Sequence, residues 1–171
     1  MLTLNMIRAK SPCRDGWAKL LKHLGKTDGD DEPLPLAIVL ASNGLDDALW
    51  CLQALPSKWD GPMRLLACDF AEMELPFVTH GEDRPRLAIE SARGFAAGTV
   101  TEEEMATAGE VARAAMWEVK ITWSAWASVW ATTRKPARAV REAARASVFA
   151  RPAAVATQSR MFAAWNERHG L

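Results

Sequence analysis

The chain has 171 residues, of which 49% are hydrophobic and 25% are charged, and these values are typical of one globular domain. Its 21 basic residues balance 21 acidic ones, which argues against attraction of the whole protein to nucleic acid or anionic lipid. Residues 1–10 lack the apolar core of a signal peptide and no run of about 18 apolar residues occurs after them, so we expect a cytoplasmic protein without a membrane span.

Helical patterns dominate the first half of the chain. Ser11-Pro12 is typical of a helix start and Gly25 of a helix end, so a helix is predicted between them. Residues 33–42 are strongly apolar, and a strand is conceivable there. We favour a short buried helix, because Asn43-Gly44 is a good helix stop. Further helices are expected at residues 45–55, 63–75 and 85–97, with a loop at 56–62.

The second half of the chain is predicted to be helical as well. Thr101 and Glu104 form a capping box that opens a long run over residues 102–133. Pro136 and Pro152 interrupt the remainder of the chain, and the two pieces after them are rich in alanine, the best helix former. We therefore predict an all-α fold for residues 1–171, a single compact domain of about seven or eight helices without strands. It would have a long Trp-bearing helix and Ala-rich C-terminal helices.

The helical spacing also predicts a core for the first half of the chain. Its expected members are apolar residues on three successive helices: Trp17, Leu21, Leu49, Trp50, Leu52, Leu66 and Phe70.

No constellation of residues in the sequence indicates catalysis. The three histidines lie far apart, and neither a metal-ligand motif nor a phosphate-binding glycine motif occurs, so we expect no metal, no cofactor and no enzymatic activity. Ser42 lacks the context of a nucleophile elbow. Cys13 lies at a helix N-terminus, which can lower a thiol pKa, but a structural role is favoured. The odd cysteine count predicts that Cys13, Cys51 and Cys68 are free thiols.

Tryptophans in the long predicted helix are the most distinctive local feature. Trp123, Trp126 and Trp130 come one after another at spacings of three and four residues, so they share one helix face. A core stripe that packs on the N-terminal helices is the favoured interpretation. The alternative is a surface anchor for a partner, because Trp is enriched among interface hot spots. In an intermediate case, part of the stripe is core and one end is exposed.

The C-terminal quarter of the chain is basic. From residue 131 onward, eight Lys or Arg residues face only two acids, and four arginines would form one helix face. A solvated face is the default interpretation, an acidic protein partner comes second and nucleic acid third. As a hypothesis, we place partner binding on the Trp-bearing and basic segment: Trp126, Trp130, Arg134, Lys135, Arg138, Arg141 and Arg145.

Several segments resemble the Imm5-like immunity proteins, which are small helical proteins encoded in bacterial genomes, phages and other mobile elements. The string NGLDDALWCL at residues 43–52 is the most specific of them. Similar segments lie at 11–25, 42–55, 64–72 and 86–115, so that residues 11–115 form the family-like part and 116–171 an Ala/Arg/Trp-rich part. Members often end in Ala/Trp/Asp-rich helices, whereas this chain has arginine in place of much of the aspartate.

The resemblance implies an all-α fold and neutralisation of a toxin by binding. Its phage-borne members imply an alternative role as an anti-defence protein, similar to an anti-CRISPR, that blocks a host defence complex or nuclease. A third class is a nucleic-acid-binding regulator that uses the basic C-terminal helices. The expected partner is thus a protein, toxin or host defence component, with an acidic surface.

Overall fold

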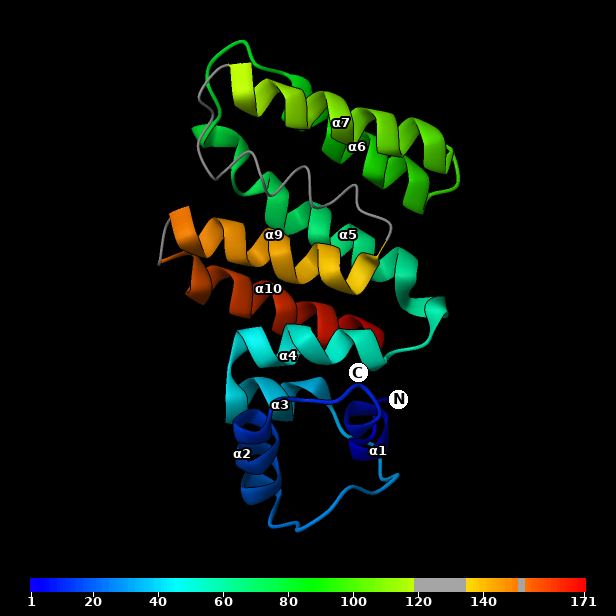
Figure 1. Cartoon of the computed structure of the whole chain (residues 1–171), viewed down its shortest axis with the longest axis vertical. Helices are drawn as coiled ribbons and strands as arrows, with labels where there is room; N and C mark the ends of the chain where they lie inside the picture. Colours follow the sequence, from blue (N-terminus) through cyan, green and yellow to red (C-terminus); the bar gives the residue numbers. More distant parts are fainter. Residues whose placement is uncertain (119–134, 151–152) are drawn as a thin grey trace. The chain divides into compact units, whose positions relative to one another are not determined.

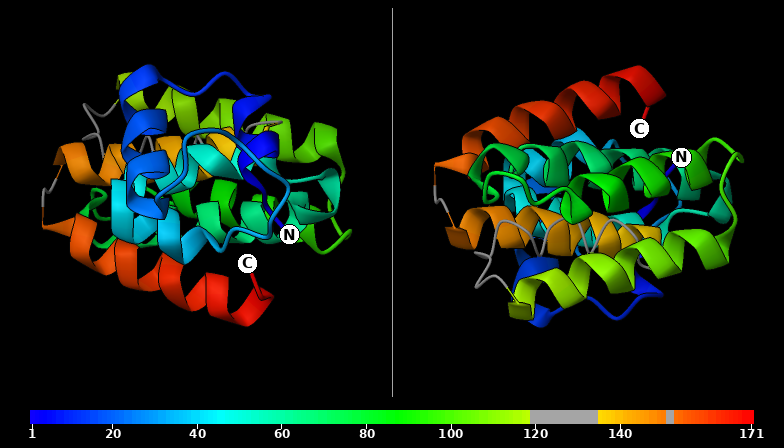
Figure 2. Two further views of the ribbon diagram at one scale, coloured as in Figure 1. Left: turned by 90° about the horizontal axis from the view of Figure 1, so that it is seen from below. Right: turned by 90° about the horizontal axis from the view of Figure 1, so that it is seen from above.

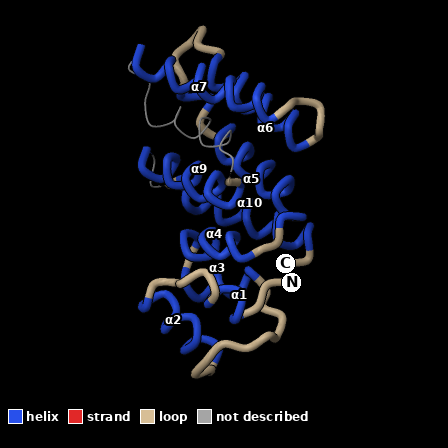
Figure 3. The backbone as a smooth tube through the Cα atoms, turned by 45° about the vertical axis from the view of Figure 1, so that its right-hand side comes forward, coloured by secondary structure: helices blue, strands red, loops and turns tan. Residues whose placement is uncertain are grey.

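The computed structural model describes residues 1–118, 135–150 and 153–171. Within these ranges every regular element is helical, as Figure 3 shows, so the predicted all-α class is confirmed. Nine α-helices occur in these ranges, where seven or eight were predicted for the whole chain. The chain forms two compact units, which are Met1–Ser57 with Thr157–Leu171 (unit 1) and Lys58–Ala156 (unit 2). The predicted division into a family-like part up to residue 115 and an Ala/Arg/Trp-rich part after it stays a prediction.

Unit 1 contains the N-terminal helices and most of the last helix. Its elements are α1 (Leu4–Arg8), α2 (Arg14–Leu24), α3 (Leu36–Asn43), α4 (Leu45–Cys51), the 3-10 turn η1 (Leu52–Ala54) and, from residue 157 onward, α10 (Ala154–His169). The apolar stretch at residues 33–42 thus forms the predicted helix rather than a strand. Gly44 comes directly after α3 with φ 95°, a conformation that favours glycine.

The predicted start of α2 is wrong by two residues. Cys13 is the N-cap, and its Sγ accepts a hydrogen bond from the backbone N–H of Gly16 at 3.4 Å. Ser11 instead adopts φ 56° and lies outside the helix. The predicted stop is confirmed, because Gly25 closes α2 in the left-handed conformation at φ 65°.

Helix α1 was not predicted from the sequence, although it supplies core residues. Leu2, Leu4 and Ile7 are at most 2% exposed. Thr3 caps the helix by accepting a hydrogen bond from the N–H of Met6, and the N–H of Leu34 donates to the carbonyl of Leu2 at 2.8 Å. A helix of five residues is too short to show a periodic pattern, because it completes little more than one turn.

The predicted N-terminal core is confirmed in part. Buried members of that set are Leu21, Leu49 and Leu52 in unit 1 and Leu66 and Phe70 in unit 2. Trp17 and Trp50 are only half-buried, contrary to the prediction. A Cβ on Gly29 would lie 3.6 Å from the Trp17 ring, so a loop covers part of this indole.

Unit 2 is arranged around helix α5 (Asp60–Glu72), which packs against α9 (Pro136–Ala150) and α6 (Arg84–Ala96). Helix α6 in turn packs against α7 (Glu102–Glu118). Figures 1 and 2 show that α5, α7 and α9 run in one direction and α6 in the other. Arg93 of α6 reinforces the pairing with α5 through Asp69 at 2.7 Å and Glu72 at 2.8 Å.

Two short 3-10 turns flank α5, and its start differs from the predicted one. Residues 56–62 were expected to be a loop, but η2 covers Ser57–Trp59 and α5 already begins at Asp60. Pro62 lies within the first turn of α5, where the missing N–H costs no hydrogen bond. The second turn, η3, covers Leu75–Phe77.

The starts of the later helices agree closely with the sequence signals. At α7, Glu104 accepts a hydrogen bond from the N–H of Thr101 at 2.8 Å, and Thr101 Oγ1 accepts one from the N–H of Glu104, so the capping box is confirmed. The predicted run to residue 133 is described only to Glu118; the rest lies outside the described residues. Helix α9 begins at Pro136, as predicted. In the described parts of the chain, no helix is long and apolar enough to cross a membrane.

Candidate functional site

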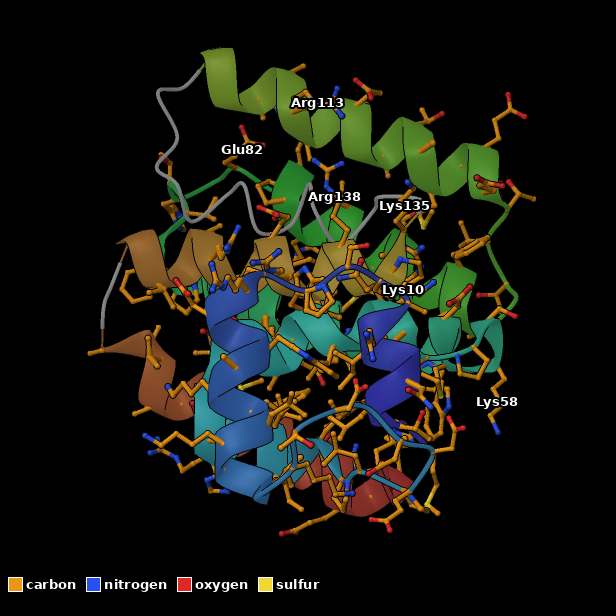
Figure 4. The ribbon with its side chains drawn as sticks, turned by 60° about the horizontal axis from the view of Figure 1, so that its bottom comes forward. Lys10, Lys58, Glu82, Arg113, Lys135 and Arg138 are labelled. Atoms are coloured by element: carbon orange, nitrogen blue, oxygen red, sulfur yellow. The ribbon has the colours of Figure 1, made fainter. Side chains whose placement is uncertain are left out.

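One face of α9 carries the basic residues that stand out in the sequence. Arg138 and Arg145 are exposed, Arg141 is half-buried, and Lys135 lies exposed just before the helix. Figure 4 shows Lys135 and Arg138 at the start of α9. We call these four residues the α9 basic face. The spacing of its arginines, three and four residues apart, keeps their side chains on one side of the helix.

The opposite side of α9 is buried and consists of small residues. Its members are at most 8% exposed: Ala139, Val140, Ala143, Ala144 and Ala146. Helix α9 therefore has two distinct sides, one packed within unit 2 and one that presents cations. The packed side fixes which way the arginines point.

The segment that bears the α9 basic face contains more basic than acidic residues. Glu142 is the only acid between residues 135 and 150, and it lies 3.9 Å from Arg145. Exposed ion pairs at such a distance contribute little energy, because water screens them. Along residues 135–150 themselves, four cations thus stand against one carboxylate.

Three residues of the predicted partner site lie outside the described residues, and these are Trp126, Trp130 and Arg134. Trp123 of the tryptophan stripe lies outside them too. The placement of the stripe in a core or at an interface therefore stays a prediction. The structure brings together the other predicted members, Lys135, Arg138, Arg141 and Arg145, along α9.

A cavity of about 320 Å³ lies at one end of unit 2. It is lined where α5, α7 and α9 begin and α6 ends, at the ends of these helices that lie together in Figure 1. Phe95, Met105 and Pro136 supply apolar wall, while Asp60 and Glu102 are exposed carboxylates on its lining. The cavity thus combines an apolar surface with charged groups.

Arg64 also lines this cavity and is 2% exposed, although it is a charged residue. Its Cζ lies 5.2 Å from the centroid of the Phe95 ring, a cation–π arrangement. Burial lowers the pKa of Arg64, and the negative charges of Asp60 and Glu102 act in the opposite direction. A guanidinium keeps its proton in proteins, so a permanent cation is held in the wall of the cavity.

The structure gives no support to the other candidate chemistry. Ser42 donates a hydrogen bond to Asn43 Oδ1 at 2.8 Å, and Asn43 contacts Asp47 at 2.8 Å, so this hydroxyl belongs to a local polar network. No group of His, Cys, Asp or Glu in the described ranges could hold a metal ion. The expectation of a protein without metal, cofactor or catalysis stays a prediction.

The three cysteines are free thiols, as predicted, and they differ in accessibility. Cys13 is exposed, whereas burial raises the pKa of both Cys51 and Cys68 to about 12. Because the thiolate is the reactive form, both buried thiols are expected to be inert at neutral pH.

Iodoacetamide is therefore expected to modify one cysteine per chain in the native protein, and all three in denaturant. Mass spectrometry of the intact protein counts the adducts, and peptide mapping locates the first one at Cys13. A second native adduct formed as rapidly as the first would contradict the burial of Cys51 and Cys68.

No family model, curated protein or solved structure matches the chain. The resemblance to Imm5-like immunity proteins therefore rests on the sequence segments alone.

Proposed function

We propose that this chain is a non-enzymatic inhibitor that binds and neutralises another protein through the α9 basic face. The observation that carries the proposal is the two-sided character of α9, whose alanine side is packed while Arg138 and Arg145 are exposed. A rigid row of arginines suits a partner with an acidic surface, because guanidinium groups bind carboxylates in bidentate geometry and are common in hot spots.

An immunity protein against a toxin is the version that the resemblance favours. A phage-encoded anti-defence protein that blocks a host defence complex or nuclease is the alternative. Both inhibit by covering a surface of the target, and neither needs a catalytic residue. The identity of the recovered partner separates them, because a toxin fits the first role and a defence component the second.

A protein partner is favoured over nucleic acid by the distribution of charge. The chain carries no net charge, and three consecutive glutamates, Glu102 to Glu104, open α7 of the same unit. Such acidic groups repel a polyanion that extends beyond the α9 basic face. A nucleic-acid-binding regulator is a further alternative. In that case the affinity for nucleic acid would fall steeply as the salt concentration rises.

Charge reversal on α9 tests the proposal. We expect the triple substitution Arg138→Glu, Arg141→Glu and Arg145→Glu to weaken partner binding at least about tenfold, mainly through a slower association rate, and more strongly at low salt. The partner is first recovered by affinity purification from the native host and identified by mass spectrometry. Surface plasmon resonance with the purified partner then gives the rates, and circular dichroism checks the fold.

A matched control comes from α2, which also carries exposed cations. Reversing Arg14, Lys19 and Lys22 to glutamate changes the net charge of the chain by the same amount, on a helix of unit 1. The control variant is expected to keep most of the affinity. Equal losses in both variants would indicate a nonspecific charge effect, and unchanged affinity in the folded α9 variant would place the interface elsewhere.

A further inference from the structure

The cavity beside Arg64 shares no lining residue with the α9 basic face and has the properties of a small-molecule site. Its volume of about 320 Å³ lies at the lower end of the range of about 300–1,000 Å³ that is usual for ligand pockets. The volume suits a molecule of the size of a single amino acid.

The charges on the lining narrow the choice of ligand. One buried cation, Arg64, and two exposed carboxylates, Asp60 and Glu102, belong to the same cavity. A simple anion would meet the two carboxylates, and a simple cation would meet the guanidinium. The helix N-termini at α5, α7 and α9 add positive potential, which partly offsets the surplus of negative charge. A ligand that carries one charge of each sign fits this lining best.

We propose that this cavity binds a free α-amino acid with an apolar side chain. The carboxylate of the ligand contacts Arg64, whose five N–H donors can serve a ligand together with the partners that it already has. The ammonium group contacts Asp60 and Glu102. The apolar side chain packs against Phe95, Met105 and Pro136, which form the uncharged part of the wall.

Gly61 provides a way to close the cavity without disturbing the fold. This residue lines the cavity in the first turn of α5, and a Cβ at this position would meet only the carbonyl oxygen of Ala96 at 3.9 Å. Because Gly61 lines the cavity and a Cβ fits there, we expect the side chain of Gly61→Leu to occupy part of the cavity, and leucine also suits a helix better than glycine. Gly61→Ala is the matched control, because it adds a single methyl group and leaves most of the cavity open.

Isothermal titration calorimetry of the full chain tests the proposal with L-leucine, L-methionine and L-phenylalanine. At least one of them is expected to bind saturably, with one molecule per chain. Two analogues of the amino acid that binds test the two charges: its primary amide, which has no carboxylate, and the corresponding carboxylic acid without the amino group. Both are expected to bind about 10- to 100-fold more weakly, because each lacks one charge-assisted contact. Gly61→Leu is expected to abolish binding, whereas Gly61→Ala preserves it.

Several outcomes would overturn the proposal. These are the absence of saturable binding by all three amino acids in the millimolar range, binding that survives in a folded Gly61→Leu variant, and equal affinity for an amino acid and its amide. Tighter binding of inorganic phosphate than of the amino acids would identify an anion site instead. Circular dichroism of each variant confirms that the helices are intact, so that loss of binding reports on the cavity.

Discussion

Replacing Phe70 by alanine is expected to lower the free energy of unfolding by about 3–5 kcal/mol. Phe70 is fully buried at 0% exposure, and it belongs to α5, the helix that packs against both α6 and α9. The loss combines the transfer free energy of the removed ring with the cost of the cavity left behind, because close-packed neighbours relax only in part. Urea unfolding followed by circular dichroism measures the change.

Phe77 provides the matched control for this substitution. It belongs to unit 2 as well, but its side chain is 49% exposed on η3. Phe77→Ala is expected to cost about 1 kcal/mol or less, because much of the ring is already in contact with water. If the two substitutions cost the same, Phe70 does not have the core position that the structure gives it.

Helix boundaries could be predicted from the sequence where a local chemical signal fixes them. The capping box of Thr101 and Glu104 and the ring of Pro136 act within one turn, so they determine the starts of α7 and α9 whatever the rest of the fold does. At α2 the signal was ambiguous. Ser11 and Cys13 both precede the helix and can both accept a hydrogen bond, and the choice of Cys13 as N-cap depends on the path of the chain.

The orientation of α5 could not be predicted in detail, and this is why the cavity was missed. Leu65 is 40% exposed although it is apolar, and Arg64 is 2% exposed although it is charged. Helix α5 has neighbours on more than one side, so a single apolar stripe is a poor guide to its buried surface. Arg64 itself could have indicated the cavity, because it is a charged residue that lies in the sequence between Met63 and Leu66, both of which are buried.

The α9 basic face could be predicted because it depends on spacing alone. Arginines three and four residues apart share a side of any helix, and alanines between them form the other side. The sequence does not show how deeply each of these residues is buried. Arg141 is half-buried while Arg138 and Arg145 are exposed, a difference that helical spacing alone does not predict.

Enlarging the alanine side of α9 is expected to destabilise the protein. Ala143 is 0% exposed in the middle of this helix, and α9 packs against α5, whose buried residues include Ala67 and Ala71. Ala143→Leu adds three carbon atoms to a buried position of a helix that packs this closely. The expected cost is about 1–3 kcal/mol, because overpacking forces strained rotamers or backbone shifts. Urea unfolding of the purified variant measures this loss.

Ala114→Leu separates overpacking from any effect of leucine on a helix. Ala114 is exposed on α7 in the same unit, and alanine and leucine differ little in helix propensity. This control is expected to change the free energy of unfolding by less than about 0.5 kcal/mol.

The comparison of the two variants also bears on partner binding, because the packed alanine side holds the arginines of α9 in place. A folded Ala143→Leu variant should therefore bind the partner more weakly than an Ala114→Leu variant. Equal stability of the two would mean that the alanine side of α9 is not closely packed.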